Sequence, residues 1–247
     1  GTVFNEPRNQ TTDGRRFADL SYAAEVAKNL HLTARAYFDG YRYHGTYVYD
    51  DGEGGRTKNE DRAWSDWFGG EVRGRWAAWE RNVLTVGAEY NYHPSAHQEN
   101  FDLPGHFTYL DDRREFGSWG IFAQDELALT SSLTLIAGLR FDRYYDRDQQ
   151  VTPRAALIWK VTDSTTVKLL YGQAFRPPNL YEQYYAYPGA GIGVVNDDLD
   201  AERIATYEGV LEQRLGHERL VAGVGVLFPR LSRRGGEHQQ AEVARRH

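Results

Sequence analysis

The chain has 247 residues, with 29 Lys and Arg against 35 Asp and Glu, a formal net charge of −6. It contains no Cys, which excludes disulfide frameworks, cysteine-type zinc sites and a cysteine nucleophile. No apolar run approaches the ~18 residues of a transmembrane helix, whereas the strands of a transmembrane β-barrel need only alternate apolar and polar residues. The net acidity disfavours nucleic acid as a partner.

Alternation with a period of two dominates the chain and predicts an all-β protein. In 133–145, Leu133, Leu135 and Leu139 alternate with polar residues such as Thr134 and Arg140. Successive side chains of a strand point to opposite faces, so each such segment has one apolar and one polar face. We expect ten strands, at 16–28, 30–43, 64–79, 81–92, 116–129, 133–145, 151–161, 165–175, 203–215 and 219–228.

The predicted connections alternate between short and long. Short turns fall at 28–29, 80, 130–132, 162–164 and 216–218, and longer links at 44–63, 93–115, 146–150 and 176–202. This alternation is typical of an antiparallel up-and-down meander in an outer-membrane β-barrel, with short periplasmic turns and long outside loops. The predicted strands are also longer than the ~5–6 residues usual in soluble sheets.

Aromatic residues gather at the ends of the predicted strands, as the two interfaces of a lipid bilayer favour. The inner ends carry Trp76, Trp79 and Trp159. The outer ends carry Phe38, Tyr41, Tyr43, Tyr90, Tyr92, Phe141, Tyr144, Tyr145, Tyr171 and Phe175. The polar face is heavily charged, which favours a wet lumen or contact with a polar plug.

Three segments resemble motifs of the barrel of TonB-dependent outer-membrane receptors. Residues 120–126 (GIFAQDE) are similar to the family's G-x-F-x-Q-D/N stretch, and residues 171–182 (YGQAFRPPNLYE) to its Y-G-x-A-F-R-A-P-x-x-x-E box, with Pro177 replacing the usual alanine. Residues 196–202 (NDDLDAE), followed by Tyr207 and Glu208, are similar to its N-P-x-L-x-P-E…Y-E box. The matching positions are Gln124, Asp125, Phe175, Arg176, Pro178, Asn196, Leu199, Glu202, Tyr207 and Glu208.

The resemblance, which covers about residues 16–228, implies a portion of a twenty-two-strand transmembrane β-barrel in the outer membrane of a Gram-negative bacterium. It implies active uptake of a scarce ligand, first an iron–siderophore, otherwise cobalamin or another ligand. Haem receptors of the family place a His between the two boxes, and no His lies between Pro178 and Asn196, so the resemblance disfavours haem. The implied partners are outer-membrane lipid and lipopolysaccharide, the small-molecule ligand, and the TonB system acting on an N-terminal region. The chain shows neither a plug nor that region, so we expect it not to transport alone.

The last residues differ from the rest. Residues 229–247 hold five Arg against two Glu and no aromatic residue. We therefore divide the chain into a partial barrel, 1–228, and an atypical basic tail, 229–247, that is either disordered or frameshifted. The absence of Met agrees with a partial chain.

The link 176–202 holds the candidate ligand-binding residues. Tyrosine rings offer stacking and a hydroxyl to catecholate, sugar or corrin ligands, and an arginine stands at the predicted strand end. The alternative interpretations are an aromatic collar for the tyrosines and strand termination at Pro177-Pro178 for the arginine. The candidates are Arg176, Tyr181, Tyr184, Tyr185 and Tyr187.

Other clusters gave weaker hypotheses. His93, His97 and His106 fall in one predicted loop, where exposed histidines are a better interpretation than a metal site. Two acidic runs suggest calcium or simple solvation, Asp50, Asp51 and Glu53 in one link and Asp197, Asp198 and Asp200 in another. A complete ten-stranded barrel acting as a porin or protease, with His44 or His93 beside acidic residues, is the alternative function. We assign no catalytic residue, metal ligand or cofactor and expect no enzyme.

Overall fold

The computed structural model describes residues 2–50, 52, 54–105, 107–144, 148–185, 199–215 and 220–232. In these residues the chain forms one ten-stranded antiparallel sheet and a short helix, α1 (Leu180–Tyr184). The strands are β1 (Gln10–Ala27), β2 (Leu30–Asp50), β3 (Arg56–Trp79), β4 (Asn82–Leu103), β5 (Phe107–Ala128), β6 (Leu133–Tyr144), β7 (Asp148–Lys160), β8 (Thr165–Arg176), β9 (Glu202–Leu215) and β10 (Leu220–Ser232). The predicted all-β meander is confirmed.

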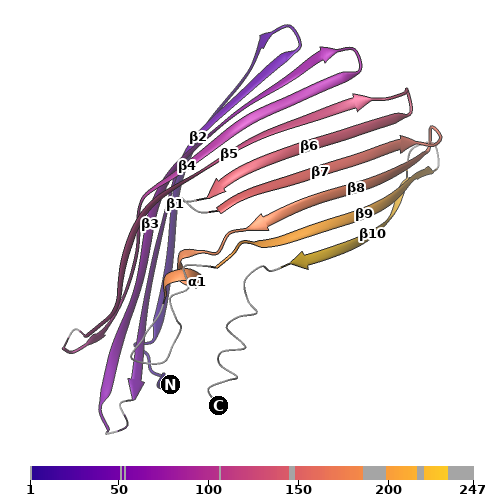
Figure 1. The fold of residues 1–247 in the computed structure, drawn as a ribbon. Helices are drawn as coiled ribbons and strands as arrows, with labels where there is room; N and C mark the ends of the chain where they lie inside the picture. Colours follow the sequence, from indigo (N-terminus) through magenta and orange to yellow (C-terminus); the bar gives the residue numbers. More distant parts are fainter. Residues whose placement is uncertain are drawn as a thin grey trace.

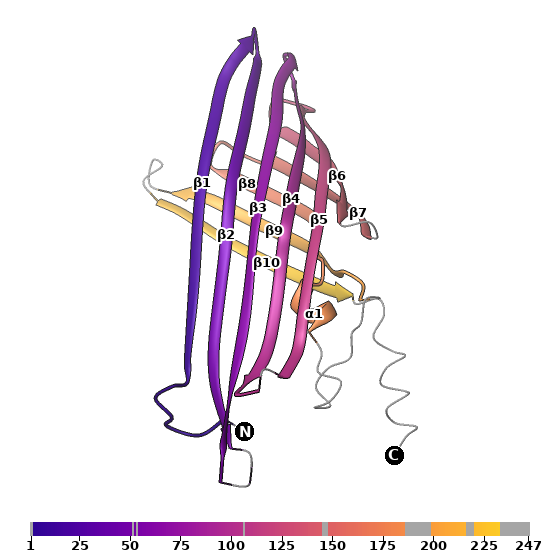
Figure 2. The same cartoon turned by 90° about the vertical axis from the view of Figure 1, so that its left-hand side faces the viewer.

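The sheet follows the chain order from β1 to β10 and curves strongly along this order. In Figure 2, β1–β5 stand in front while β8–β10 pass behind them at a steep angle. The helix α1 lies in the trough between these two walls (Figures 1 and 2). We call the side of the sheet that bounds the trough the inner face, and the other side the outer face.

Two hairpins are much longer than the sequence pattern predicts. Most of the predicted links 44–63 and 93–115 is strand: β2 and β3 have 21 and 24 residues, and β4 and β5 have 22 each. Their ladder continues through pairs such as Thr46 with Glu60 and Asn59 with Asp102. Because both faces carry polar residues here, the apolar alternation disappears while backbone pairing persists. We call this end of the sheet the extended end, and the opposite end the short-turn end.

The outer face carries an apolar band between two rows of aromatic residues. In the row nearer the extended end, ring centroids lie 5.1 Å apart for Phe38 and Phe68 and 5.0 Å apart for Tyr171 and Tyr207. At the short-turn end, Trp76 lies 6.0 Å from Trp79. From Phe68 to Trp76 the strand advances about 26 Å at ~3.3 Å per residue. A tilt of ~35–45° reduces this length to about 20 Å of height, compared with ~25 Å for the apolar band of a transmembrane barrel. Exposed apolar side chains fill the interval, among them Val72, Val86, Ile121, Leu139, Leu169 and Leu211.

The inner face is charged, and several of its charges form ion pairs. Arg140 contacts Glu89 at 3.0 Å, and Lys168 contacts Glu212 at 2.5 Å. Tyr144, predicted as part of the outer aromatic band, lines a hollow on this face instead. Tyr41 and Tyr43 also share the inner face, because they continue the odd-numbered register of β2 from Arg35 and Tyr37, whereas Phe38 lies on the outer face.

The C-terminal strand runs past its predicted end. β10 continues from Phe228 through Pro229 to Ser232, which pairs with Arg203 of β9. Pro229 is compatible with the ladder because β10 is an edge strand. Residues 233–247, most of the proposed tail, lie outside the described residues. Among the residues that are described, no helix is both long and apolar enough to cross a membrane.

We expect Leu139→Arg to destabilise the sheet in lipid by about 2–4 kcal/mol, because Leu139 lies in the apolar band of the outer face and is 54% exposed. Urea-dependent unfolding in lipid vesicles measures the loss. Thr134→Arg on the inner face of the same strand is the matched control and should cost much less. Equal losses for the two variants would contradict the assignment of the faces.

Candidate functional site

The strand β8 ends where two prolines remove backbone donors. Pro177 and Pro178 follow Arg176, the last residue of β8, one residue beyond the predicted end. Asn179 then caps α1: its Oδ1 accepts the N–H of Glu182 at 2.8 Å, while Glu182 Oε2 accepts the N–H of Asn179 at 2.9 Å. This reciprocal capping box fixes where the helix begins.

Arg176 joins the second and third sequence motifs. Its Nη1 and Nη2 atoms each lie 3.0 Å from a carboxylate oxygen of Glu182, and its Nε lies 3.1 Å from Oε2 of Glu202. Hydrogen bonds to Glu182, then to Glu202, raise the pKa of Arg176 further above its already high value. The arginine therefore ties α1 to the start of β9, as the strand-termination interpretation requires, and its predicted ligand role stays a prediction.

The segment after β8 brings two of the candidate tyrosines to the far wall of the trough. The guanidinium of Arg114, on β5, lies 3.3 Å from the ring centroid of Tyr184. Asn100, on β4, donates from Nδ2 to the hydroxyl of Tyr185 at 3.1 Å. Tyr181 stacks on Tyr185 with a centroid distance of 4.2 Å. Tyr181, Tyr184 and Tyr185 are thus gathered on the inner face of the β4–β5 hairpin.

A buried layer of amides and carboxylates underlies Tyr185. Asn59 and Asn100 exchange hydrogen bonds of 2.7 and 3.2 Å, and Asn59 also donates to Asp102 at 2.9 Å. Burial raises the pKa of Asp61, although hydrogen bonds from Asn100 and Tyr185 oppose that effect. The side-chain Nε2 of Gln98 is buried without a hydrogen-bond partner among the described residues.

A polar hollow of about 620 Å³ opens on the inner face beside Phe175 and Pro177. Ion pairs hold part of its wall, since Arg140 Nη2 lies 2.6 Å from Asp142 and 3.0 Å from Glu89. The charged residues around it are Glu71, Arg73, Glu89, Arg140, Asp142 and Arg154. This arrangement suits a polar occupant.

The remaining motif residues that the structure describes lie in the sheet or close to the ends of its strands. Tyr207 belongs to the outer aromatic row, and Glu208 points to the other face, opposite Leu227. Asp125 interrupts the apolar outer face near the short-turn end, where it accepts a hydrogen bond of 2.5 Å from Asn82. Gln124 lies on the inner face opposite Thr85 and Gly138, Pro178 is buried, and Leu199 is half-buried. Asn196 and Tyr187 lie outside the described residues.

Two of the three predicted loop histidines, His93 and His97, are in a strand, so their assignment to a loop is wrong. His93 lies in β4 between the rings of Trp67 and Phe116, at centroid distances of 5.3 and 4.2 Å. His97 lies in the same strand, and its side chain is only 14% exposed. Of the two acidic runs, Asp50 ends β2 and Asp200 precedes β9, while His106, Asp51, Glu53, Asp197 and Asp198 lie outside the described residues.

Sequence reasoning missed the wall that receives the tyrosines. The predicted links 44–63 and 93–115 contain the residues of this wall, which are Asn59, Asp61, Asn100 and Arg114. No alternation in the sequence marks this wall, because residues 59–61 and 98–100 are polar at every position.

Comparison with known proteins decides the family. The model of the family described as "TonB dependent receptor-like, beta-barrel" matches residues 1–227. The chain belongs to this family of receptor barrels.

Curated and structural relatives of the receptor barrel agree with this assignment. The chain is 28% identical to the ferric enterobactin receptor of Pseudomonas aeruginosa over 164 residues, which are 58% of this chain and 22% of that protein. It is 36% identical to the vitamin B12 transporter BtuB of Vibrio cholerae over 73 residues, 30% of this chain and 12% of that protein. The chain thus matches about a fifth or less of the length of these curated relatives.

Solved structures show the same fold. The ferric-catecholate import receptor Fiu of E. coli superposes with a TM-score of 0.67 at 12% identity, covering 91% of this chain and 42% of that one. The ferric citrate transporter FecA superposes with a TM-score of 0.65 at 15% identity, covering 92% and 36%. The open ten-stranded sheet therefore corresponds to part of a larger barrel in these structures.

In the receptor barrel, Arg176→Gln should loosen α1 more than it lowers global stability. The substitution removes the paired contacts with Glu182 and weakens the tie to Glu202, but exposed ion pairs contribute less than about 1 kcal/mol. Faster hydrogen exchange in 179–185 at an unchanged unfolding midpoint is expected. Arg176→Lys, which keeps the charge without the planar fork, should give an intermediate rate, and unchanged exchange in both variants would refute the tie.

The pH dependence of the extended hairpin should change in Asp61→Asn. Because burial raises the folded-state pKa of Asp61 above its ordinary 3.8, the protonated form is favoured when folded. Its stabilisation is present at low pH and declines as pH rises through the raised value. Between about pH 4 and pH 7, the protection of the β3–β4 ladder from hydrogen exchange should decline in the wild type and should not show this decline in the variant.

A neighbouring carboxylate acts in the opposite sense and sets the control. Burial raises the pKa of Glu60, but hydrogen bonds from Lys58 and His44 outweigh this and lower it to about 2. Its stabilisation is therefore lost as pH falls from about 4.5 towards 2. Glu60 is common to the wild type and Asp61→Asn, so their difference isolates Asp61. Asp50→Asn at the end of β2 should leave the wild-type profile unchanged.

Proposed function

We propose that the chain forms part of the wall of an outer-membrane receptor of a Gram-negative bacterium that actively takes up a scarce ligand, with a ferric siderophore as the first candidate. The observation that carries the proposal is the meeting of Tyr184 with Arg114 and of Tyr185 with Asn100 across the trough. These contacts place aromatic faces and a cation on the inner face at the extended end.

The outer face supports placement in a membrane. Two aromatic rows bound an apolar band, as at the interfaces of transmembrane barrels. Just beyond the aromatic row that lies nearer the extended end, Asp66 binds Arg16 at 3.0 Å and Arg42 at 3.1 Å. Charged residues therefore begin where the apolar band ends. Lipid and lipopolysaccharide are the partners proposed for this surface.

Ferric catecholates match the chemistry of the inner site. They are aromatic anions, so a guanidinium and tyrosine rings attract them through charge and stacking. The similarity to the ferric enterobactin receptor, at 28% identity, supports this ligand class. Cobalamin is the second candidate, supported by the 36% identity with the vitamin B12 transporter and by the suitability of tyrosine rings for a corrin.

The inner face also supports a polar plug and coupling to TonB. The paired charges around the hollow present donors and acceptors to a polar domain rather than to lipid. Uptake powered by TonB through an N-terminal region is the mechanism proposed for the whole receptor. The relatives matched are named as receptors and transporters, which supports transport over catalysis.

Ligand titration in detergent tests the proposal. Ferric enterobactin should quench the tryptophan fluorescence of the purified chain with saturation, and Arg114→Gln and Tyr184→Leu should each weaken binding about tenfold, or about 1.4 kcal/mol. Arg113→Gln, the adjacent residue on the outer face, is the matched control. Saturable binding of cyanocobalamin alone would favour the second candidate, and binding unaffected by Arg114→Gln and Tyr184→Leu would contradict the site.

A further inference from the structure

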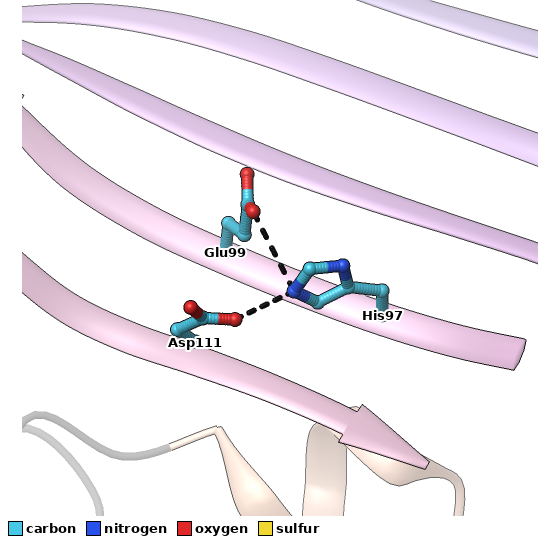
Figure 3. A group of neighbouring side chains, drawn as sticks. All are labelled: His97, Glu99 and Asp111. Carbon is cyan, nitrogen blue, oxygen red and sulfur yellow. Dashed lines mark hydrogen bonds and ion pairs between the residues drawn. The ribbon is translucent and has the colours of Figure 1, made fainter. Parts of the chain in front are cut away.

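Three potential metal ligands converge on the outer face of the β4–β5 hairpin (Figure 3). Nε2 of His97 lies 2.6 Å from Oδ1 of Asp111 and 3.5 Å from Oε1 of Glu99. One ligand atom from each residue lies within 4.8 Å of the others. The three side chains point toward a common centre from two neighbouring strands.

The ladder fixes this convergence. Glu99 pairs directly with Asp111 across the two strands, and His97 lies two residues before Glu99, so all three share one face. Two carboxylates directly opposite each other repel, whereas a cation between them removes the repulsion. The backbone pairing therefore holds together a ligand set that is unfavourable without a positive charge.

The spacing suits a small divalent ion. Ligands at ~2.0–2.1 Å from a tetrahedral zinc ion lie about 3.3 Å from one another. The contact between His97 and Glu99, 3.5 Å, is already close to that value. Asp111 has to withdraw by about 0.7 Å from its 2.6 Å contact, which its exposed side chain permits without moving the strand.

The surroundings orient the imidazole and leave the centre accessible. The ring of Trp64 lies 4.3 Å from the ring of His97, whose side chain is only 14% exposed, while that of Asp111 is 64% exposed. Arg62, opposite Glu99, contacts Glu60 at 3.2 Å instead. Arg113, opposite His97, is exposed and sets an electrostatic limit on the affinity.

We propose that His97, Glu99 and Asp111 bind a divalent transition-metal ion of the zinc class, with a fourth position open to water. One imidazole nitrogen with two carboxylate oxygens favours Zn²⁺, Co²⁺ or Ni²⁺ over Mg²⁺ and Ca²⁺, which prefer oxygen alone. The site lies on the face opposite Tyr184 and Arg114, so it is separate from the proposed transport ligand. The ion links β4 to β5 at the extended end of the sheet, beyond the aromatic row that lies nearer this end.

Titration of the metal-free full chain in detergent tests the site. Calorimetry should show one equivalent of Zn²⁺, bound on the order of 100-fold more tightly than Mg²⁺. Co²⁺ should give the strong visible absorption of a tetrahedral centre. His97→Gln should abolish both signals, and Asp111→Asn, a change at an exposed side chain, should weaken binding at least tenfold.

His31→Gln is the matched control, because His31 is exposed at the short-turn end of β2, away from the cluster. It should retain wild-type binding, and circular dichroism should show the same strand content in every variant. Stoichiometric Zn²⁺ binding that survives both His97→Gln and Asp111→Asn would overturn the proposal. So would the loss of the Co²⁺ spectrum in His31→Gln alone.

Discussion

The ladder of backbone hydrogen bonds that joins β1 to β10 in chain order is the constraint on which the rest of the structure depends. A lipid-facing strand finds no water for its peptide groups, so each must pair with its neighbour. This pairing fixes the register, and the register decides which side chains meet lipid and which meet the trough. One interaction thus creates both the apolar band around Ile121 and Leu139 and the charged wall around Arg140.

The sequence predicts the band-forming part of each strand well because there the two faces meet different solvents. Leu133–Tyr144 shows the alternation clearly. In residues 56–60 of β3 both faces are polar, so hydropathy carries no information about a ladder that nevertheless continues. Prediction of the aromatic rows fails for a related reason. Phe38 and Tyr41 are both aromatic residues near the predicted end of one strand, but they lie on opposite faces of the sheet.

The candidate site could be predicted only in part. The tyrosines and Arg176 are visible as a composition and a motif. The partners of Tyr184 and Tyr185, which are Arg114 and Asn100, lie 70 and 85 residues away in the chain. Such contacts depend on the curvature of the sheet, which brings the segment after β8 to the wall formed by β3–β5. A local pattern does not encode that distance. The same holds for His97, because its proposed role as a metal ligand depends on Asp111, which the pairing of β4 with β5 brings next to it.

The long hairpins give the rim of the receptor an unequal stiffness. On one side, β2–β5 continue as paired strands well beyond the aromatic row that lies nearer the extended end. Bending this part of the sheet would break several of its backbone hydrogen bonds at once. On the other side, β8 ends before two prolines, and the single turn of α1 that follows is held by a few side-chain contacts. Under the proposed function, a ligand that enters the trough would meet a stiff wall of paired strands on one side and, in α1, a single helical turn that only a few side-chain contacts hold in place.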